Sequence, residues 1–323
     1  MTGAAGQTWV LLRGLMRDSR HWGAFPDTFR RYFPNARIEL IDFPGNGLLN
    51  LQASPLTVDA MADHARAELA RRGLKPPYCL LAMSLGAMAA TAWADQHPDE
   101  IAACVLVNTS LRPFSPPHWR LRPAVWPALL RMLMKPPAPR EIERSILKLT
   151  SRSAPETVLD DWAAWRLSHP VSPANALRQL AAAARYRAPP TAPDVPLLIV
   201  NGAGDQLVDP RCSQRLAAAW DRELAVHPTA GHDLPLDDAA WVIERIRETS
   251  PSLTTIETLT RLPSIGGPRT SFTRRSSSAD AAPSIDDLEA TLRAQHAGCR
   301  VLLVEDDPGD VLMTQEAFEE HKV

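Results

Sequence analysis

Three polar side chains, far apart in the chain, are of the types needed for nucleophilic acyl transfer. They are Ser84, Asp205 and His232, in that order along the sequence. A serine hydroxyl becomes a good nucleophile only when a base takes its proton, and an imidazole suits that role near neutral pH. The imidazole needs a carboxylate that fixes its tautomer and stabilises the imidazolium. The three residues therefore predict a nucleophile, a base and an orienting acid.

The residues around Ser84 predict a sharp turn from a strand into a helix. The apolar run 78–83 suits a buried strand, and the small residues of 85–94 favour a helix. Such a turn requires small side chains two positions before and after the serine, where this chain has Ala82 and Gly86. Glycine is usual at both positions, so Ala82 is a departure. The alternative interpretation is a serine that only caps a helix.

Two aspartates compete for the acid role. Asp205 lies at the tip of a loop after the apolar run 195–201. Asp209 precedes Pro210, which is the pattern of a helix N-cap followed by a proline at the first helical position. We therefore favour Asp205. His232 follows Gly231, which favours a shaped turn over an ordinary loop histidine.

Acyl transfer also needs hydrogen-bond donors for the oxyanion of the intermediate. One expected donor is the backbone N–H of Leu85, at the start of the helix after Ser84. The second is expected from the turn at 14–16, and we choose the N–H of Leu15. A backbone donor leaves no trace in the residue type, so this choice depends on the turn alone.

Strand and helix patterns alternate along most of the chain. Strands are predicted at 8–12, 37–42, 78–83, 101–108, 195–201 and 223–227, and helices at 19–33, 57–72, 85–94, from 209 onward and at 239–248. This alternation predicts an α/β fold with a mostly parallel sheet and helices on both faces. Functional groups of such sheets gather at the carboxyl ends of the strands, where Ser84, Asp205 and His232 would converge.

Residues 111–194 interrupt the alternation with many prolines. Amphipathic stretches at 126–134, 141–149 and 174–186 predict an inserted helical subdomain. It carries 13 Arg and Lys against 6 Asp and Glu. We favour a solvated basic surface over a docking site for an anionic partner or substrate. Its tryptophans either line an apolar pocket or hold a small core; they are Trp119, Trp126, Trp162 and Trp165.

Composition narrows the partners. The 323 residues carry a net charge of −2, which gives no reason to expect nucleic acid. The four cysteines show no CxxC spacing, so we expect no disulfide framework, metal or cofactor. We see no signal peptide and no apolar run of about 18 residues that could span a membrane. The cytoplasm is the expected location.

The chain resembles the α/β-hydrolase superfamily over residues 8–248. The matching segments are Leu12-Arg-Gly-Leu15, Asp42-Phe-Pro-Gly-Asn-Gly47, Ala82-Met-Ser-Leu-Gly86, Asn201-Gly-Ala-Gly-Asp205 and Gly231-His232. Family members usually have His-Gly where this chain has Arg13-Gly14. The resemblance implies a Ser84–His232–Asp205 triad, an oxyanion hole from Leu15 and Leu85, and a helical cap at 111–194. It implies a core formed by 1–110 and 195–249.

Within the superfamily the chain is similar to the carboxylesterase branch that demethylates pimeloyl groups on acyl carrier protein. That branch has Trp-Ser-Leu-Gly at the turn, where this chain has Met83-Ser-Leu-Gly86. The resemblance makes a carrier-protein-bound acyl group one option for the substrate. A free small-molecule ester or thioester is the other.

The C-terminal part has a different composition. Residues 250–298 are rich in Ser, Thr, Pro and Gly, which predicts a disordered linker, with a short helix at 285–296. Residues 299–323 resemble the first strand and helix of a response-regulator receiver domain, with Asp306 and Asp307 at the family's magnesium-binding acidic pair. Too little chain follows for a phosphoacceptor, so we predict a truncated fragment without phosphotransfer.

Three hypotheses for function follow. The first is a serine hydrolase that cleaves a carboxylic ester or thioester through an acyl-enzyme on Ser84. The second is a ligand-sensing signalling protein with a hydrolase-like binding domain and a receiver-derived tail. The third is a catalytically silent binding fold, which the departures at Arg13 and Ala82 favour weakly and the intact triad residues oppose.

Overall fold

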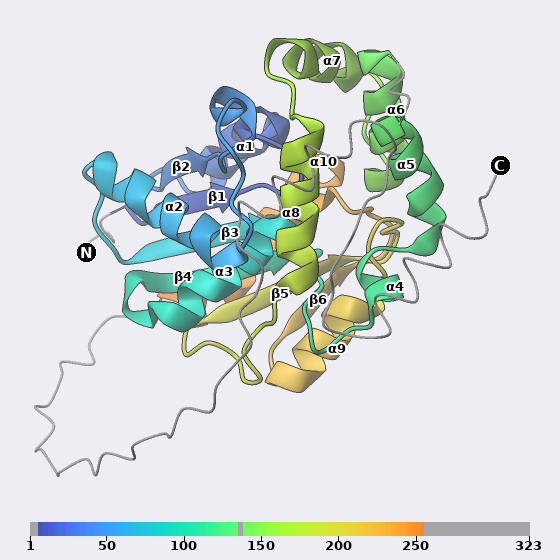
Figure 1. Ribbon diagram of the computed structural model, residues 1–323. Coiled ribbons are helices and arrows are strands. Elements are labelled where there is room, and N and C mark those ends of the chain that lie inside the picture. The colour runs from blue at the N-terminus through green and yellow to red at the C-terminus, as the bar shows by residue number, and fades with distance from the viewer. Residues whose placement is uncertain (1–5, 135–137, 255–323) are drawn as a thin grey trace, which may run out of the picture. The chain divides into compact units, whose positions relative to one another are not determined.

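A computed structural model describes residues 6–134 and 138–254 (Figure 1). Six strands form one sheet in the order β2-β1-β3-β4-β5-β6, and every neighbouring pair is parallel. The strands are β1 Thr8–Leu12, β2 Arg37–Ile41, β3 Tyr78–Met83, β4 Ile101–Val107, β5 Leu197–Gly202 and β6 Leu224–His227. The predicted α/β fold with a parallel sheet is confirmed, and its strands lie within a residue or two of the predicted ranges.

Helices cover both faces of the sheet. They are α1 Phe25–Tyr32, α2 Val58–Arg71, α3 Leu85–Gln96, α9 Arg211–Trp220, α10 Leu234–Asp237 and α11 Ala239–Thr254, with short 3-10 turns η1 Ser19–Trp22, η2 Gly47–Leu49 and η3 Pro98–Glu100. Helices α2, α3 and α9 pack on one face, and α1 and α11 on the other. This arrangement requires strands that are apolar on both sides.

Alternate residues of the central strands serve the two faces. Leu80 of β3 belongs to the core under α2 and α3, and its neighbour Leu81 belongs to the core under α1 and α11. All side chains of β3 and β4 are buried. A strand buried on both faces reads as a continuous apolar run, which is why these strands were visible in the sequence.

Some boundaries differ from the predicted ones. The helix expected at 19–33 is split into η1 and α1 because Gly23, with φ of 52°, breaks the helical backbone. Helix α9 begins at Arg211, with Pro210 before it, so the expected proline at the first helical position is one residue off. Helix α11 continues to Thr254, past the boundary at 249 that composition indicated.

The residues between β4 and β5 form the insert, defined as 111–194. Its helical segments are α4 Pro117–Arg120, η4 Pro123–Val125, α5 Trp126–Met134, α6 Pro139–Thr150, α7 Val158–Ser168 and α8 Pro173–Arg185. Helix α7 was not predicted, because its two tryptophans and two aspartates do not form a clear apolar stripe. In Figure 1, α6 and α7 lie at one end of the molecule and α8 runs from there across the sheet.

The insert has a small core of its own. Leu147 of α6 and Leu159 and Trp162 of α7 are buried against one another, with Trp165 packed beside them. The two tryptophans of α7 therefore hold this core, which was one of the two predicted roles. No helix in the described ranges is long and apolar enough to cross a membrane. The predicted segments at 285–296 and 299–323 lie outside the described residues.

Candidate active site

Ser84 lies at a strained turn between β3 and α3. Its φ of 53° and ψ of −117° are rarely adopted by a residue other than glycine, and such strain is held only where the surroundings enforce it. Its N–H donates to the carbonyl of Val107 at 2.9 Å, and its own carbonyl accepts from the Thr109 hydroxyl at 3.1 Å. The last residue of β4 and the loop that follows it thus hold the turn through both its N–H and its carbonyl.

Two glycines allow the backbone of β1 to approach this turn. A Cβ placed on Gly86 would lie 2.6 Å from the carbonyl oxygens of Leu12 and Arg13. A Cβ on Gly14 would lie 3.0 Å from the Cβ of Ser84. Glycine is therefore required at position 86, two residues after the serine. Before it, Ala82 is buried in β3 within the core under α2 and α3, where a methyl group fits.

His232 and Asp205 are brought together although 27 residues separate them. His232 Nδ1 lies 2.7 Å from Asp205 Oδ2, and both side chains are buried. The other carboxylate oxygen accepts from the N–H groups of Leu207 and Val208 at 2.8 and 2.9 Å. A carboxylate held in this way orients the imidazole ring of His232 through its Nδ1.

Asp209, the rival for the acid role, is engaged elsewhere. Its carboxylate accepts from the backbone N–H of Arg211 at 3.0 Å and from the Arg211 guanidinium at 2.9 and 2.7 Å. The bond to the Arg211 guanidinium is the main reason that the pKa of Asp209 lies below its usual value. Asp209 therefore stabilises the start of α9, and the carboxylate that meets His232 is that of Asp205.

Asn108 links the histidine loop to the end of β5, which leads to Asp205, and the sequence analysis missed it. Its side-chain amide donates to the carbonyls of Gly231 and His232 at 3.0 and 2.7 Å. Its oxygen accepts from the N–H of Gly202 at 2.8 Å. The next residue, Thr109, holds the carbonyl of Ser84. Its signal in the sequence was a polar asparagine at the carboxyl end of an apolar strand, the edge where functional groups are expected.

No hydrogen bond joins the Ser84 hydroxyl to His232 among the described residues. Consecutive residues hold the two groups, since Asn108 binds the carbonyl of His232 and Thr109 binds that of Ser84. The side chain of Ser84 is half-buried. A serine–histidine contact in a site of this kind often tightens only when a substrate binds. The roles assigned to Ser84, His232 and Asp205 stay predictions.

The two expected oxyanion donors are free for such a role. Neither the N–H of Leu15 nor that of Leu85 donates a hydrogen bond to another described residue. Leu85 is the first residue of α3, and the first N–H groups of a helix have no partner within the helix. The N–H of Met16, in contrast, donates to Gln179 of α8 at 2.8 Å. The turn continues with Arg17, whose N–H donates back to Gly14 at 3.3 Å.

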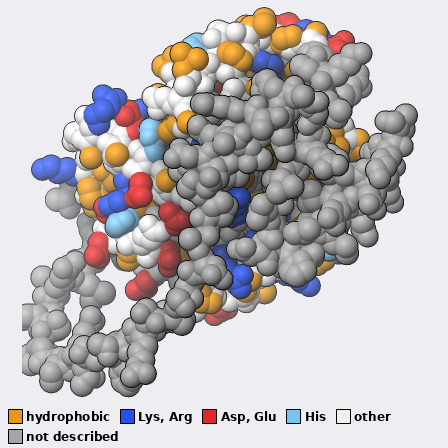
Figure 2. Space-filling view, viewed as in Figure 1, with side chains coloured by type: hydrophobic (Ala, Val, Ile, Leu, Met, Phe, Trp, Pro, Cys, Tyr) orange, Lys and Arg blue, Asp and Glu red, His pale blue; other side chains and the backbone are white. Residues whose placement is uncertain are grey.

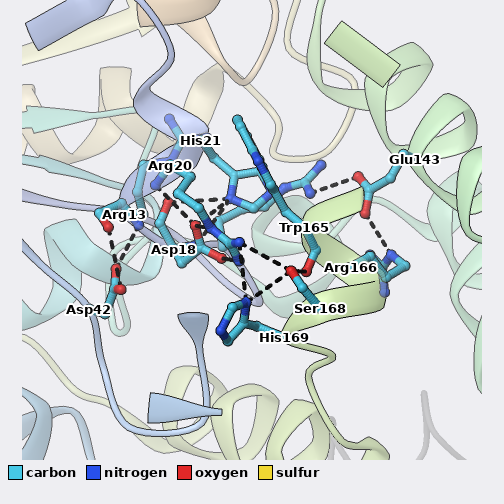
Figure 3. Close-up of polar contacts among 12 residues, drawn as sticks. Arg13, Asp18, Arg20, His21, Asp42, Glu143, Trp165, Arg166, Ser168 and His169 are labelled. Carbon is cyan, nitrogen blue, oxygen red and sulfur yellow. Dashed lines mark hydrogen bonds and ion pairs between the residues drawn. The ribbon is translucent and has the colours of Figure 1, made fainter. Parts of the chain in front are cut away.

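A polar cluster lies beyond this turn, between residues 16–21 and helices α6 and α7 (Figure 3). Glu143 bridges Arg17 and Arg166, with contacts of 2.7 and 2.6 Å, and the two guanidinium groups hold its pKa low against the opposing effect of burial. Asp18 binds Arg20 and His21 in the same view. These contacts fasten the insert to the turn that carries Leu15. The described residues contain no cluster of metal-binding side chains.

Some arginines of the insert are bound within the insert itself. Arg140 pairs with Asp160, and Arg144 with Glu156. Arg120 donates to the carbonyl of Ala183 at 2.5 Å. These contacts lie inside the insert, so its excess of 13 basic over 6 acidic residues is unchanged, and both interpretations of its surface stay predictions.

Comparison with known proteins places the chain in a family. Residues 12–239 match the family model of the alpha/beta hydrolase fold, so the chain belongs to that family. Its structure resembles that of a thermophilic esterase from Thermogutta terrifontis, with 22% identity, a TM-score of 0.62, and coverage of 78% of this chain and 92% of the esterase. An esterase from Rhodococcus sp. ECU1013 has 20% identity and a TM-score of 0.59, over 77% of this chain and 92% of the other.

A curated relative, the uncharacterized protein YbdG of Bacillus subtilis (strain 168), is 26% identical over 83 residues. This match spans 26% of each of the two proteins, about a quarter of the relative's length.

Proposed function

We propose that the protein is a serine hydrolase that cleaves a carboxylic ester or thioester through an acyl-enzyme on Ser84. The observation that carries the proposal is the combination of a strained serine at the end of β3 with a buried, hydrogen-bonded His232–Asp205 pair on neighbouring loops. A serine that only capped a helix would need neither the strain nor the pair.

The chemistry follows from these positions. The hydroxyl of Ser84 attacks the substrate carbonyl while Nε2 of His232 takes the proton, and Asp205 stabilises the resulting imidazolium. The N–H groups of Leu15 and Leu85 donate to the oxyanion of the tetrahedral intermediate. His232 then protonates the leaving alkoxide or thiolate. Water, activated by the same histidine, attacks the acyl-enzyme and releases the acid.

The insert would act as a cap over this site. It contacts the histidine loop, where the N–H of Asp233 donates to the carbonyl of Thr150 at 2.6 Å. Leu48, Leu51 and Leu167 are 81%, 95% and 69% exposed, and Asn50 Nδ2, between the first two, donates to Pro170. Figure 2 shows hydrophobic side chains on the surface at the α7 end of the molecule. Exposed apolar side chains on these segments would suit an apolar acyl group, and esterases among the similar structures support the same substrate class.

The alternative is a binding protein with a hydrolase fold. The missing Ser84–His232 hydrogen bond favours it. For either function we propose a cytoplasmic location, supported by the cysteines in the described part of the chain, which are free and buried: Cys79, Cys104 and Cys212.

The first experiment is labelling with a fluorophosphonate, read by intact mass, on wild type, Ser84→Ala and His232→Ala. Ser110→Ala is the matched control, because Ser110 is a buried serine close in sequence to Asn108 and Thr109. The proposal expects labelling of wild type and of Ser110→Ala only. A folded wild type that resists the label would favour the binding protein.

The second experiment separates the two aspartates. Hydrolysis of p-nitrophenyl butyrate and of its thioester analogue should fall by about 10³- to 10⁴-fold in Asp205→Asn, which loses the orienting carboxylate. Asp209→Asn should keep kcat close to that of wild type. Equal losses in both variants would contradict the assignment. The ratio of kcat/KM for the ester to kcat/KM for the thioester in wild type then decides between the two substrate classes.

A further inference from the structure

Arg13 is the buried residue at the position where the resembling family has histidine. Its guanidinium forms a two-point ion pair with Asp233, with Nη1–Oδ1 at 3.1 Å and Nη2–Oδ2 at 2.6 Å. Both side chains are 3% exposed. Nη1 also lies 3.5 Å from the sulfur of Met83, and the guanidinium packs 4.9 Å from the ring centre of Trp22.

Stability does not explain this pair. Removing two charges from water has a large unfavourable cost, and apolar residues of similar volume are often as stabilising or more so. The pairing is also incomplete, because the buried Arg13 Nε has no hydrogen-bond partner. A buried ion pair with an unpartnered donor is therefore weak evidence for a contribution to stability, and a role in positioning has to be considered.

The contacts of Arg13 lie directly beside each part of the proposed site. Asp233 follows His232, Met83 precedes Ser84, and Gly14-Leu15, with the expected oxyanion donor, follows Arg13 itself. One rigid, planar group therefore touches a neighbour of the base and a neighbour of the nucleophile, and is covalently continuous with the oxyanion turn. Trp22 supports the guanidinium from its face, which limits its rotation.

We propose that Arg13 is a positioning residue that sets the distances among the nucleophile, the base and the oxyanion donor through its pair with Asp233. The inference rests on the proposed serine hydrolase function. It assigns to Arg13 and Asp233 a role in kcat and none in contact with the substrate. A displacement of about 1 Å among reacting groups lowers rates by about 100-fold, so the rigidity of this contact matters more than its strength.

The positive charge of Arg13 and the negative charge of Asp233 also cancel next to His232. Burial alone would raise the pKa of Asp233, but the Arg13 guanidinium outweighs it and holds the pKa below its ordinary value. Asp233 thus stays ionised and neutralised next to His232. A replacement of both residues removes two opposite charges together, so it tests position with little change in the net charge around the histidine.

The decisive variant is therefore Arg13→Met/Asp233→Leu, which replaces the pair by apolar side chains of similar total volume. Its matched control is Arg66→Met/Glu100→Leu, because Arg66 and Glu100 also form a two-point pair, at 2.9 and 2.7 Å, but lie on α2 and η3. Arg13→Lys keeps the charge but cannot make both bonds to Asp233. Thermal unfolding, kcat and KM for p-nitrophenyl butyrate are measured for each.

The expected result is a double variant with a melting temperature close to that of wild type, a kcat about 10- to 100-fold lower and a KM within about threefold. Arg13→Lys should lose about 10-fold in kcat at unchanged KM, and the control pair should keep kcat.

A folded Arg13→Met/Asp233→Leu with the kcat of wild type would overturn the inference. Failure of both Arg13 variants to fold would overturn it as well, because the pair would then be a structural requirement. A wild type that resists the fluorophosphonate refutes the proposed function, and this inference with it. A labelled wild type whose double variant labels at the same rate refutes the inference alone.

Discussion

Replacement of Asn108 by alanine is the most demanding test of how the site is assembled. Asn108 is fully buried at the end of β4 and has a φ of 48°. Its amide makes four hydrogen bonds: two donated, to the carbonyls of Gly231 and His232, and two accepted, from Gly202 N–H and Asn201 Nδ2. Alanine removes all four and leaves the partners buried.

The expected loss of stability follows from these contacts. Each lost hydrogen bond contributes about 1 kcal/mol, so the four together amount to about 4 kcal/mol. Asparagine tolerates the left-handed backbone better than alanine does, which adds about 1 kcal/mol. The free energy of unfolding should therefore fall by about 5 kcal/mol in Asn108→Ala. Asn108→Gly loses the same bonds without the backbone strain and should be about 1 kcal/mol more stable than the alanine variant.

Activity should respond more sharply than stability. The amide of Asn108 holds the carbonyl of His232 itself, so its loss frees the histidine loop. We expect kcat for p-nitrophenyl butyrate to fall by about 100-fold under conditions where the variant is folded. Asn50→Ala is the control, because the Asn50 amide makes one exposed bond to Pro170 and should cost less than about 0.5 kcal/mol.

The assay is urea unfolding at pH 7, followed by tryptophan fluorescence, with kcat measured on the same samples. A loss below about 1 kcal/mol in Asn108→Ala would refute the reasoning, since it would mean that the four contacts contribute almost nothing. An alanine variant more stable than the glycine variant would refute the argument from backbone strain.

Three further predictions concern other parts of the fold. Burial, with help from a nearby arginine, lowers the pKa of His21 to about 4, so the unfolded chain takes up a proton near pH 6.5 that the folded protein does not. Between pH 6.5 and 4 the free energy of unfolding should therefore fall by about 3 kcal/mol through His21, and the total fall in urea titrations of His21→Asn should be smaller by this amount; an equal fall in both proteins would contradict the assignment. Gly86→Ala should lower the free energy of unfolding, measured by thermal unfolding, by about 3 kcal/mol, because its Cβ would meet backbone oxygens. Gly73→Ala has open space but a φ of 72°, so it should lose about 1 kcal/mol; equal losses would contradict this. Gln179→Leu loses three hydrogen bonds and should lose about 3 kcal/mol in the free energy of unfolding. Its kcat should also fall, because the N–H of Met16, in the turn beside Leu15, loses its bond to α8; an unchanged kcat would show that the turn does not need α8.

Much of the fold was readable from local pattern. Strands β3 and β4 are buried on both faces, so their apolar runs were continuous and their ends fell close to the predicted residues. The turn at Ser84 was visible because a sharp change from strand to helix demands a small residue at position 86. Helix α7 was missed, because its burial is against α6 and not along one regular stripe.

The sequence by itself determined which groups could do chemistry and the order in which the strands present them. Only the tertiary structure decided which groups meet. Asp205 and Asp209 are four residues apart and equal in chemistry, yet one binds His232 and the other binds Arg211. The pairing of Arg13 with Asp233 joins residues 220 positions apart. Local periodicity reports burial and backbone shape, whereas such contacts depend on how loops at the carboxyl ends of parallel strands converge, and that is a property of the whole sheet.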